Sequence, residues 1–281
     1  MSALLTVRGL VKEYPARSRS RDKAPLRAVN GIDLDVERGQ TLAIVGESGS
    51  GKSTTGRAIL RLIEATAGTI MFDGIDIRRL PTRELRALRS RMQIVFQDNG
   101  AALDPRWSVG RLLAEPLRRH EQLTRREQSR RIADMLDRVG LDPRHTTRYP
   151  HEFSGGQRQR IGIARALMVH PELVVCDEPV SALDVSVQAQ VLNLMKDLQD
   201  EFGLTYLFIS HDLSVVEFMA DSVAVMSRGN LVESGPCSDI MTKPQHSYTR
   251  ALLAAVPVPD PSVYADRAAR RALIRSGIEH L

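Results

Sequence analysis

Residues 46–53 have the side-chain types and the spacing that hold the phosphates of a nucleotide. They read GESGSGKS and match the pattern G-x-x-x-x-G-K-[ST] at every position. Glycines let the backbone curl so that successive N–H groups converge on phosphate oxygens. Lys52 would neutralise the β- and γ-phosphates, and the Ser53 hydroxyl would ligate Mg²⁺. The predicted nucleotide-binding residues are Gly46, Glu47, Ser48, Gly49, Ser50, Gly51, Lys52, Ser53 and Thr54.

The segments on either side of this loop are those that the motif requires. A short apolar run at 41–45 is typical of a strand, and a helical pattern follows the loop as far as Ile63. A helix that begins near Lys52 would point its positive dipole end at the bound phosphates. This strand–loop–helix order distinguishes the motif from a chance glycine-rich loop.

A second strand candidate ends in two carboxylates. Residues 173–176 are apolar and are followed directly by Asp177 and Glu178. Many strands end in solvated acids, but a strand end beside a phosphate-binding loop is where a Mg²⁺-side aspartate lies in such NTPases. We therefore expect Asp177 to serve Mg²⁺. Glu178, one residue further on, would orient or deprotonate an attacking water.

A second candidate anion site lies between these two motifs. Its residues open a predicted helix, with a serine cap followed by two glycines that leave backbone N–H groups exposed. One nucleotide rarely needs two such sites from one chain, so the second site is expected to serve a nucleotide held by another copy. The residues predicted to act in trans are Ser154, Gly155, Gly156 and Gln157.

The run FSGGQRQR, placed between the loop and the Asp-Glu strand, resembles the signature of the ATP-binding cassette (ABC) ATPases. The resemblance implies that Tyr14 in VKEYP stacks on adenine, with an ordinary strand-edge tyrosine as the alternative. It implies that Gln97 ligates Mg²⁺ and senses a membrane partner, and that Asp184 lies at a dimer interface. His211 in FISHD would contact the γ-phosphate. The catalytic residues implied are Glu178, His211 and Lys52.

The long basic loop before AVNGIDLD resembles the second (F-type) ATPase of dipeptide and oligopeptide importers more than the first. Two further segments resemble the ATPases of these importers. They read FQDNGAALDPRWSVGRLLAEPL and KPQHSYTRALLAAVP, with Asn99, Ala102 and Ser247 departing from the usual residues. Many relatives carry a cysteine cluster after the second segment. This chain has no cysteine after Cys237, so no iron–sulfur cluster is expected. The run YPHEF before the signature favours import, and His151 and Glu152 in it could contact a permease or form a capping turn.

Composition is that of an ordinary globular protein. Of 281 residues, 42% are apolar and 26% charged, and the net charge is +5. No run approaches the ~18 apolar residues of a membrane helix, and the start lacks a secretory signal pattern. Cys176 and Cys237 suit neither a disulfide framework nor a metal site. These features indicate a cytoplasmic chain. The resemblance to importer ATPases implies that it lies at the cytoplasmic face of the cell membrane, held there by permease subunits.

Alternating strand and helix patterns predict an α/β fold with a parallel sheet. With the resemblance, which covers roughly residues 4–256, this becomes a P-loop NTPase core of the ABC ATPase type. It should have a mostly parallel sheet, an N-terminal antiparallel β part and a helical subdomain inserted at about 98–160. The ATPase domain is expected at 1–256, and 257–281 is expected to be a C-terminal tail. The basic loop at 15–27 and the tail are interpreted as solvated segments.

The resemblance implies an ATP-hydrolysing subunit that powers peptide import. Its expected partners are two permease subunits, a second ATPase subunit that is a paralogue, and an extracytoplasmic substrate-binding protein. Nickel or glutathione as cargo is an alternative, because the cargo does not touch this subunit. A non-transport ABC ATPase acting on nucleic acid or ribosomes is a further alternative. It rests on the basic charge alone, and no nucleic-acid partner is expected.

Overall fold

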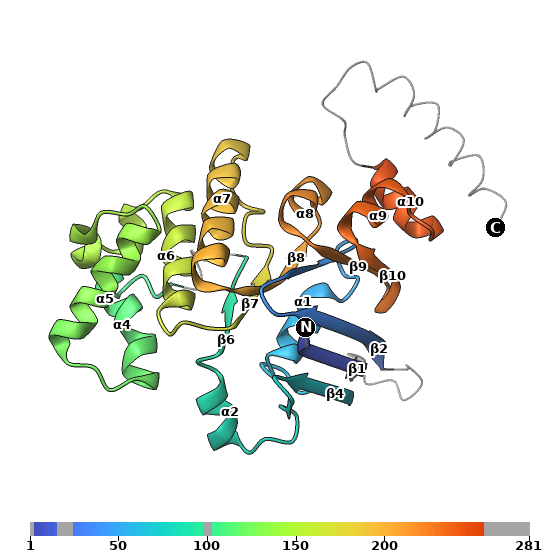
Figure 1. Ribbon diagram of the computed structural model, residues 1–281, viewed down its shortest axis with the longest axis horizontal. Helices are drawn as coiled ribbons and strands as arrows, with labels where there is room; N and C mark the ends of the chain where they lie inside the picture. Colours follow the sequence, from blue (N-terminus) through green and yellow to red (C-terminus); the bar gives the residue numbers. More distant parts are fainter. Residues whose placement is uncertain (1–2, 16–24, 98–102, 256–281) are drawn as a thin grey trace.

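Two β-sheets form the centre of the molecule (Figure 1). The computed structural model describes residues 3–15, 25–97 and 103–255. The smaller sheet is antiparallel and has the strand order β2–β1–β4–β5. Its strands are β1 (Ala3–Tyr14), β2 (Leu26–Glu37), β4 (Ala67–Phe72) and β5 (Ile75–Asp76).

The larger sheet has the order β10–β9–β3–β8–β7–β6, and all its strand pairs except β9–β10 are parallel. Every residue of β3, β7 and β8 is buried, as expected for parallel strands covered on both faces. The predicted α/β fold with an N-terminal antiparallel part is confirmed. The strands are β3 (Thr41–Val45), β6 (Met92–Val95), β7 (Leu173–Asp177), β8 (Thr205–Ser210), β9 (Ser222–Ser227) and β10 (Asn230–Pro236).

Helices cover the larger sheet and also form a separate group at one end of the molecule, where α4 and α5 lie in Figure 1. The described residues between β6 and β7 form helices and loops without a strand. The domain limits near 98, 160 and 256 stay predictions. The helices are α1 (Lys52–Ile59), α2 (Thr82–Leu88), α4 (Val109–His120), α5 (Arg125–Arg138), α6 (Gly155–Leu167), α7 (Val185–Phe202), α8 (Leu213–Met219), α9 (Cys237–Thr242) and α10 (Ser247–Ala254), with short 3₁₀ turns η1 (Pro143–Thr147) and η2 (Pro150–Glu152).

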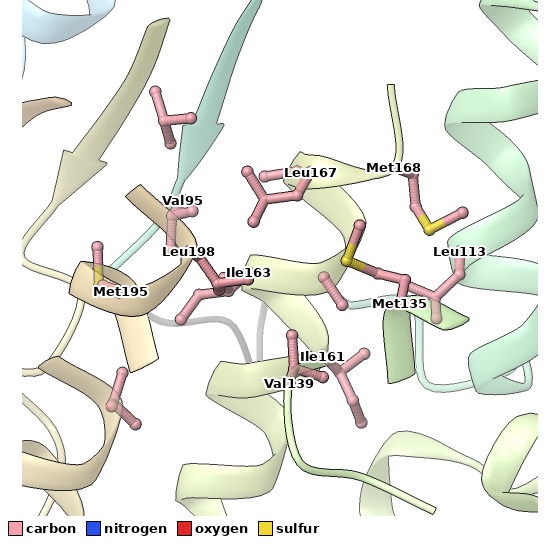
Figure 2. Packing of buried hydrophobic residues seen from close by; sticks show 14 of the residues in the cluster. Val95, Leu113, Met135, Val139, Ile161, Ile163, Leu167, Met168, Met195 and Leu198 are labelled. Carbon is pink, nitrogen blue, oxygen red and sulfur yellow. The ribbon is translucent and has the colours of Figure 1, made fainter. Parts of the chain in front are cut away.

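Helix α6 is buried between the α4–α5 group and the larger sheet (Figure 2). Ile161 of α6 shares one apolar cluster with Leu113 of α4, and Ile163 shares it with Val95 of β6. Fully burying such a side chain contributes roughly 1.5–3 kcal/mol relative to leaving it exposed. Packing on both sides therefore fixes the axis of α6, and with it the position of the predicted signature at its first turn.

Helix α1 is shorter than its sequence pattern predicts, because it ends at Ile59 rather than continuing to Ile63. Arg61 adopts a left-handed backbone with a φ of 49°. The Leu62 N–H donates to Arg57 O, and the Arg61 N–H donates to Ala58 O. These bonds form the helix-ending arrangement that usually has glycine at the left-handed position. Because arginine fills that position, the sequence lacks the expected stop signal.

Three expectations fall on residues outside the described part of the chain. They concern most of the basic loop at 15–27, the segment with Asn99 and Ala102, and the tail at 257–281. Within the described residues, every helix is too short or too polar to cross a membrane. Cys176 is fully buried, in agreement with its interpretation as a small core residue.

Candidate active site

The loop between β3 and α1 can be built only with glycine at two of its positions. Gly46 has a φ of 148°, and a Cβ there would lie 2.1 Å from Met226 O. Gly51 has a φ of 106°, and a Cβ there would lie 2.3 Å from Ala28 O. Both backbone angles are rare for other residues, and both contacts are with backbone atoms that cannot yield easily. The loop is therefore pressed between β9 and β2.

Lys52 opens α1 and is 5% exposed. Its ammonium donates hydrogen bonds to Gly46 O and Glu47 O, both at 2.8 Å. Burial lowers the pKa of Lys52, while the negative charges of Glu178 and Asp177 oppose that shift. An anion beside this ammonium would be stabilised by its charge.

The start of α1 also offers free donors. Gly51 precedes the helix and provides no side-chain cap, so the first N–H groups of α1 lack that partner. The Ser50 hydroxyl is buried and has no hydrogen-bond partner within the described part of the chain. A buried hydroxyl without a partner is costly unless a ligand or water satisfies it. These features fit a bound phosphate group.

Ser53 and Asp177 meet beside this loop, as the sequence predicts for a Mg²⁺ site. The Ser53 hydroxyl donates to Asp177 Oδ1 at 2.6 Å, and Asp177 is 2% exposed. Hydroxyl and carboxylate oxygens are hard ligands that suit Mg²⁺. Within the described residues, no group of three His, Cys, Asp or Glu side chains could hold a metal ion. A Mg²⁺ site here would therefore also use phosphate, amide or water oxygens.

Arg57 is a neighbour of Asp177 that the sequence reasoning missed. Its guanidinium lies 3.4 Å from Asp177 Oδ2. Arg57 follows Ser53 by four residues, so the two side chains share one face of α1. That spacing is the signal that could have identified it.

Glu178 joins side chains from three adjacent strand ends. Its Oε2 accepts a hydrogen bond from Gln97 Nε2 at 2.9 Å and lies 3.2 Å from His211 Nδ1. Gln97 follows β6, Glu178 follows β7 and His211 follows β8, and these parallel strands are neighbours in the sheet. Their carboxyl ends therefore meet at one edge. Glu178 has a φ of 50°, and its N–H donates to Ile209 O at 3.0 Å.

A pocket of about 580 Å³ contains most of the predicted residues. Tyr14, at the end of β1, lies on its wall with 37% of its surface exposed, and the Lys12 ammonium lies 4.9 Å from the centre of the Tyr14 ring. Leu26 and Ala28 add an apolar edge that the sequence reasoning did not identify. The lining residues are Tyr14, Leu26, Ala28, Ser48, Gly49, Gly51, Lys52, Ser53, Thr54, Gln97, Glu178 and His211.

The signature residues are elsewhere and do not line this pocket. The Ser154 hydroxyl accepts from the Gln157 N–H at 3.3 Å, and Gln157 Oε1 accepts from the Ser154 N–H at 3.0 Å. This reciprocal cap starts α6 as the sequence predicts. Ser154 and Gly155 are exposed, whereas a Cβ on Gly156 would lie 2.3 Å from Val187 Cγ1. The first turn of α6 is therefore pressed against α7.

Asp184 precedes α7 and is exposed next to this turn. A Cβ on Gly155 would lie 3.6 Å from Leu183 Cδ2, which places the two loops in contact. Val185, the first residue of α7, is 83% exposed. One surface thus carries the start of α6, Asp184 and the exposed Val185.

The YPHEF run forms a turn. Glu152 Oε2 accepts from the Tyr149 N–H at 2.6 Å, and the rings of Tyr149 and His151 stack with centres 5.8 Å apart. This is the capping turn that was the alternative to a permease contact. Contact with a permease stays a prediction.

Comparison with protein families agrees with this geometry. Residues 29–181 match the family model described as ABC transporter, and residues 232–275 match the model described as oligopeptide/dipeptide transporter, C-terminal region. The chain belongs to the ABC transporter family. As an ABC ATPase, it is an ATP-hydrolysing enzyme.

The chain is similar to named members over most of its length. It is 53% identical to a putative peptide import ATP-binding protein of Brucella ovis, over 94% of this chain and 82% of that protein. It is also 53% identical to the glutathione import ATP-binding protein GsiA of Escherichia coli K12, over 92% of this chain and 42% of that longer protein.

Solved structures share the fold. A dimeric, post-hydrolysis ATP-binding cassette bound to ADP and Pi superimposes with a TM-score of 0.74 and 28% identity. That match covers 83% of this chain and 98% of the other chain. The cbiO1 subunit of an ABC transporter complex of Clostridium perfringens gives a TM-score of 0.75 at 27% identity, over 86% of this chain and 92% of that subunit.

Proposed function

We propose that the chain is the ATPase subunit of an ABC importer for peptides. The observation that carries this proposal is the combination, in one chain, of the 580 Å³ pocket and the C-terminal oligopeptide/dipeptide transporter region. The pocket contains the residues for ATP binding and hydrolysis, and the C-terminal region indicates the class of transporter. The peptide import name of the Brucella ovis relative supports the same cargo.

ATP binds in the pocket through its base and its phosphates. Tyr14 stacks on adenine, because its exposed ring lies on the pocket wall. Lys52 and the N–H groups of the loop residues that line the pocket hold the phosphates. Ser53, Asp177 and Gln97 hold Mg²⁺, which when bound neutralises part of the phosphate charge.

Hydrolysis depends on Glu178. Its carboxylate accepts a proton from the attacking water, and the contacts with Gln97 and His211 hold that carboxylate in place. His211 and Lys52 stabilise the charge that develops on the transferred phosphate. Glu178 has a left-handed backbone, which turns the chain sharply after β7. Asp177 and Glu178 can therefore serve different roles although they are adjacent in sequence.

The site becomes complete when two ATPase subunits meet. The signature residues are exposed and lie away from the pocket of their own chain, so they can cap a nucleotide held by the opposing subunit. Closure excludes water and completes the site. The second subunit is a paralogue, which the resemblance to the F-type ATPase of such importers favours. The exposed Val185 and Asp184 lie at the interface.

A groove of about 320 Å³ offers a docking place for a permease segment. It lies between β6, α4 and α6, and its wall includes Phe96, the residue before Gln97. A segment seated there contacts both the helical group and the strand end that holds Gln97. The lining residues are Arg89, Gln93, Ile94, Phe96, Leu103, Glu115, Pro116, Arg119, His120, Gly162, Arg165 and Ala166.

Two permease subunits bound in this way hold the ATPase at the cytoplasmic face of the membrane. An extracytoplasmic binding protein delivers the peptide to those permeases. Glutathione is the second candidate cargo, because a relative with 53% identity is named for glutathione import.

Purification of the tagged chain from its native membranes in mild detergent tests this proposal. The expected partners are two permeases, a second ATPase and a substrate-binding protein. Dipeptides, glutathione and nickel are then compared as stimulants of ATP hydrolysis by the purified complex with its binding protein. Recovery of ribosomal proteins or nucleic acid without permeases would contradict the transport function.

A further inference from the structure

The C-terminal region reaches the nucleotide-binding loop through one tyrosine. The Tyr248 hydroxyl accepts a hydrogen bond from the Glu47 N–H at 3.1 Å, across 201 residues of sequence. Tyr248 lies in the first turn of α10, within the residues that match the oligopeptide/dipeptide transporter region. Glu47 is the second residue of the phosphate-binding loop. The part of the chain that indicates the transporter class thus touches the part that binds phosphate.

The position of Tyr248 is set by two sets of contacts. Glu233 of β10 accepts from the N–H groups of Gln245 at 2.6 Å and His246 at 3.0 Å, and this fixes the chain just before α10. His246 Nδ1 in turn accepts from the Tyr248 N–H at 3.1 Å. The Tyr248 ring packs on the apolar cluster that includes Val45 of β3. Backbone anchoring and ring packing together leave the hydroxyl directed at the loop.

The backbone of Glu47 is held through both its N–H and its carbonyl. Its carbonyl accepts from Lys52 Nζ at 2.8 Å and from the Ser50 N–H at 3.2 Å, and its N–H donates to Tyr248. Ser48 and Gly49 line the pocket, whereas Glu47 does not. The tyrosine therefore holds the loop from outside the pocket and leaves the pocket-facing donors free.

We infer that Tyr248 is a positioning residue for the phosphate-binding loop. This inference rests on the proposed function, in which the loop binds ATP. When Lys52 turns from the Glu47 carbonyl toward a phosphate, the loop loses one of its internal bonds. The hydrogen bond that the Tyr248 hydroxyl accepts from the loop remains, and it keeps the first half of the loop in the conformation that binds phosphate. By thermodynamic reciprocity, bound nucleotide also stabilises the contact of α10 with the loop.

Tyr248→Phe tests the inference, because it removes the hydroxyl and keeps the ring in its apolar cluster. The full chain should bind a fluorescent ATP analogue about 2- to 10-fold more weakly, the effect of losing one neutral hydrogen bond. In the purified transporter, KM for ATP should rise by the same factor while kcat stays within about twofold. An unchanged Kd and KM would overturn the inference.

Tyr206→Phe is the matched control. The Tyr206 hydroxyl donates to Met195 O at 3.0 Å in the buried part of β8, and Tyr206 does not line the pocket. This variant should lower the thermal stability and leave the Kd for the ATP analogue unchanged. If both variants weaken binding equally, the effect is general destabilisation and the inference fails.

Amide hydrogen exchange measures the contact itself. In the wild-type chain, the ATP analogue should slow exchange across Ser247–Ala254, and this slowing should disappear in Tyr248→Phe. Equal slowing in both proteins would overturn the inference and leave ATP binding intact. A wild-type chain that binds no nucleotide would instead overturn the proposed function, and the inference with it.

Discussion

Glu178 accepts a hydrogen bond from the Gln97 amide and lies 3.2 Å from His211 Nδ1. Glu178 is predicted from its place after an apolar strand pattern, and Gln97 and His211 are implied by the resemblance to ABC ATPases. Their meeting point follows from the sheet order, in which the strands that end at these residues are adjacent. Tyr248 could not be predicted in the same way, because it lies outside these motifs and contacts a residue 201 positions away. Local patterns carry little information about such contacts.

Glu178→Gln should keep ATP binding and lose hydrolysis. The amide preserves the size of the side chain but cannot accept the proton of the attacking water. We expect at least about a 100-fold fall in the rate of phosphate release, within the range for loss of a general base. The Kd for ATP should change little. Glu201→Gln on the exposed end of α7 is the control and should keep the wild-type rate. Near wild-type turnover in Glu178→Gln would rule out its proposed role.

The elements of the two sheets are tied together by a group of four charged residues. Arg38 follows β2 and contacts both Asp73, which follows β4, and Glu172, which precedes β7. Arg91, just before β6, contacts the same two acids. This arrangement connects the antiparallel sheet to the parallel sheet near the starts of β6 and β7. The sequence shows four unremarkable charges, and only the tertiary fold makes them a network.

Glu172→Gln should reduce stability in a pH-dependent way. Hydrogen bonding by Arg91, followed by that of Arg38, lowers the pKa of Glu172 below its ordinary value of 4.5. The stabilisation is therefore present above pH 4.5 and is lost as the pH falls through the lowered pKa. At pH 7 the variant should lose about 1 kcal/mol, because partly exposed ion pairs are screened by solvent. The free energy of unfolding is measured by urea denaturation at several pH values.

A pH-independent difference between wild type and Glu172→Gln would contradict this explanation. Asp35→Asn is the control, since the Arg8–Asp35 pair is half exposed and isolated from this network. It should have a smaller effect at every pH.

One strand and the end of one helix were not predicted from the sequence. Strand β4 did not appear in the sequence pattern, and glycine within it explains why. Gly68 has a φ of 97°, and a Cβ there would lie 2.5 Å from Gly9 O of β1. Close approach of two strands requires this glycine, yet glycine weakens the strand signal. The early end of α1 at Ile59 has a similar cause, since Arg61 takes a conformation that its residue type does not indicate.

At the scale of the whole molecule, the pocket and the signature lie on different parts of one chain. The pocket gathers the phosphate-binding loop and Glu178, while Ser154 at the start of α6 is exposed elsewhere. Two anion sites in one sequence predicted this separation. The groove beside Phe96 was not predicted, because its wall combines residues from α4, α6 and β6 that meet only after folding.

Ser154→Ala should leave ATP binding by the isolated chain unchanged. It should reduce ATP hydrolysis by the assembled transporter about 10-fold or more, because a donor to the developing phosphate charge is lost. The loss of its cap should also lower stability by about 1 kcal/mol. Thr124→Ala is a matched control, because Thr124 forms the same reciprocal cap with Glu127 at the start of α5. It should lose similar stability and keep hydrolysis. Equal ATPase rates in the two variants would contradict a role for the signature in trans.

Peptide uptake by the purified transporter tests the central claim most directly. The complex is placed in vesicles with its binding protein, and ATP is supplied on the side of the ATPase subunits. Labelled dipeptide should accumulate only with ATP, and Glu178→Gln in this chain should reduce the initial rate at least about 10-fold, since loss of the general base slows the hydrolysis that powers import. Active ATP hydrolysis without accumulation of any peptide would contradict the account.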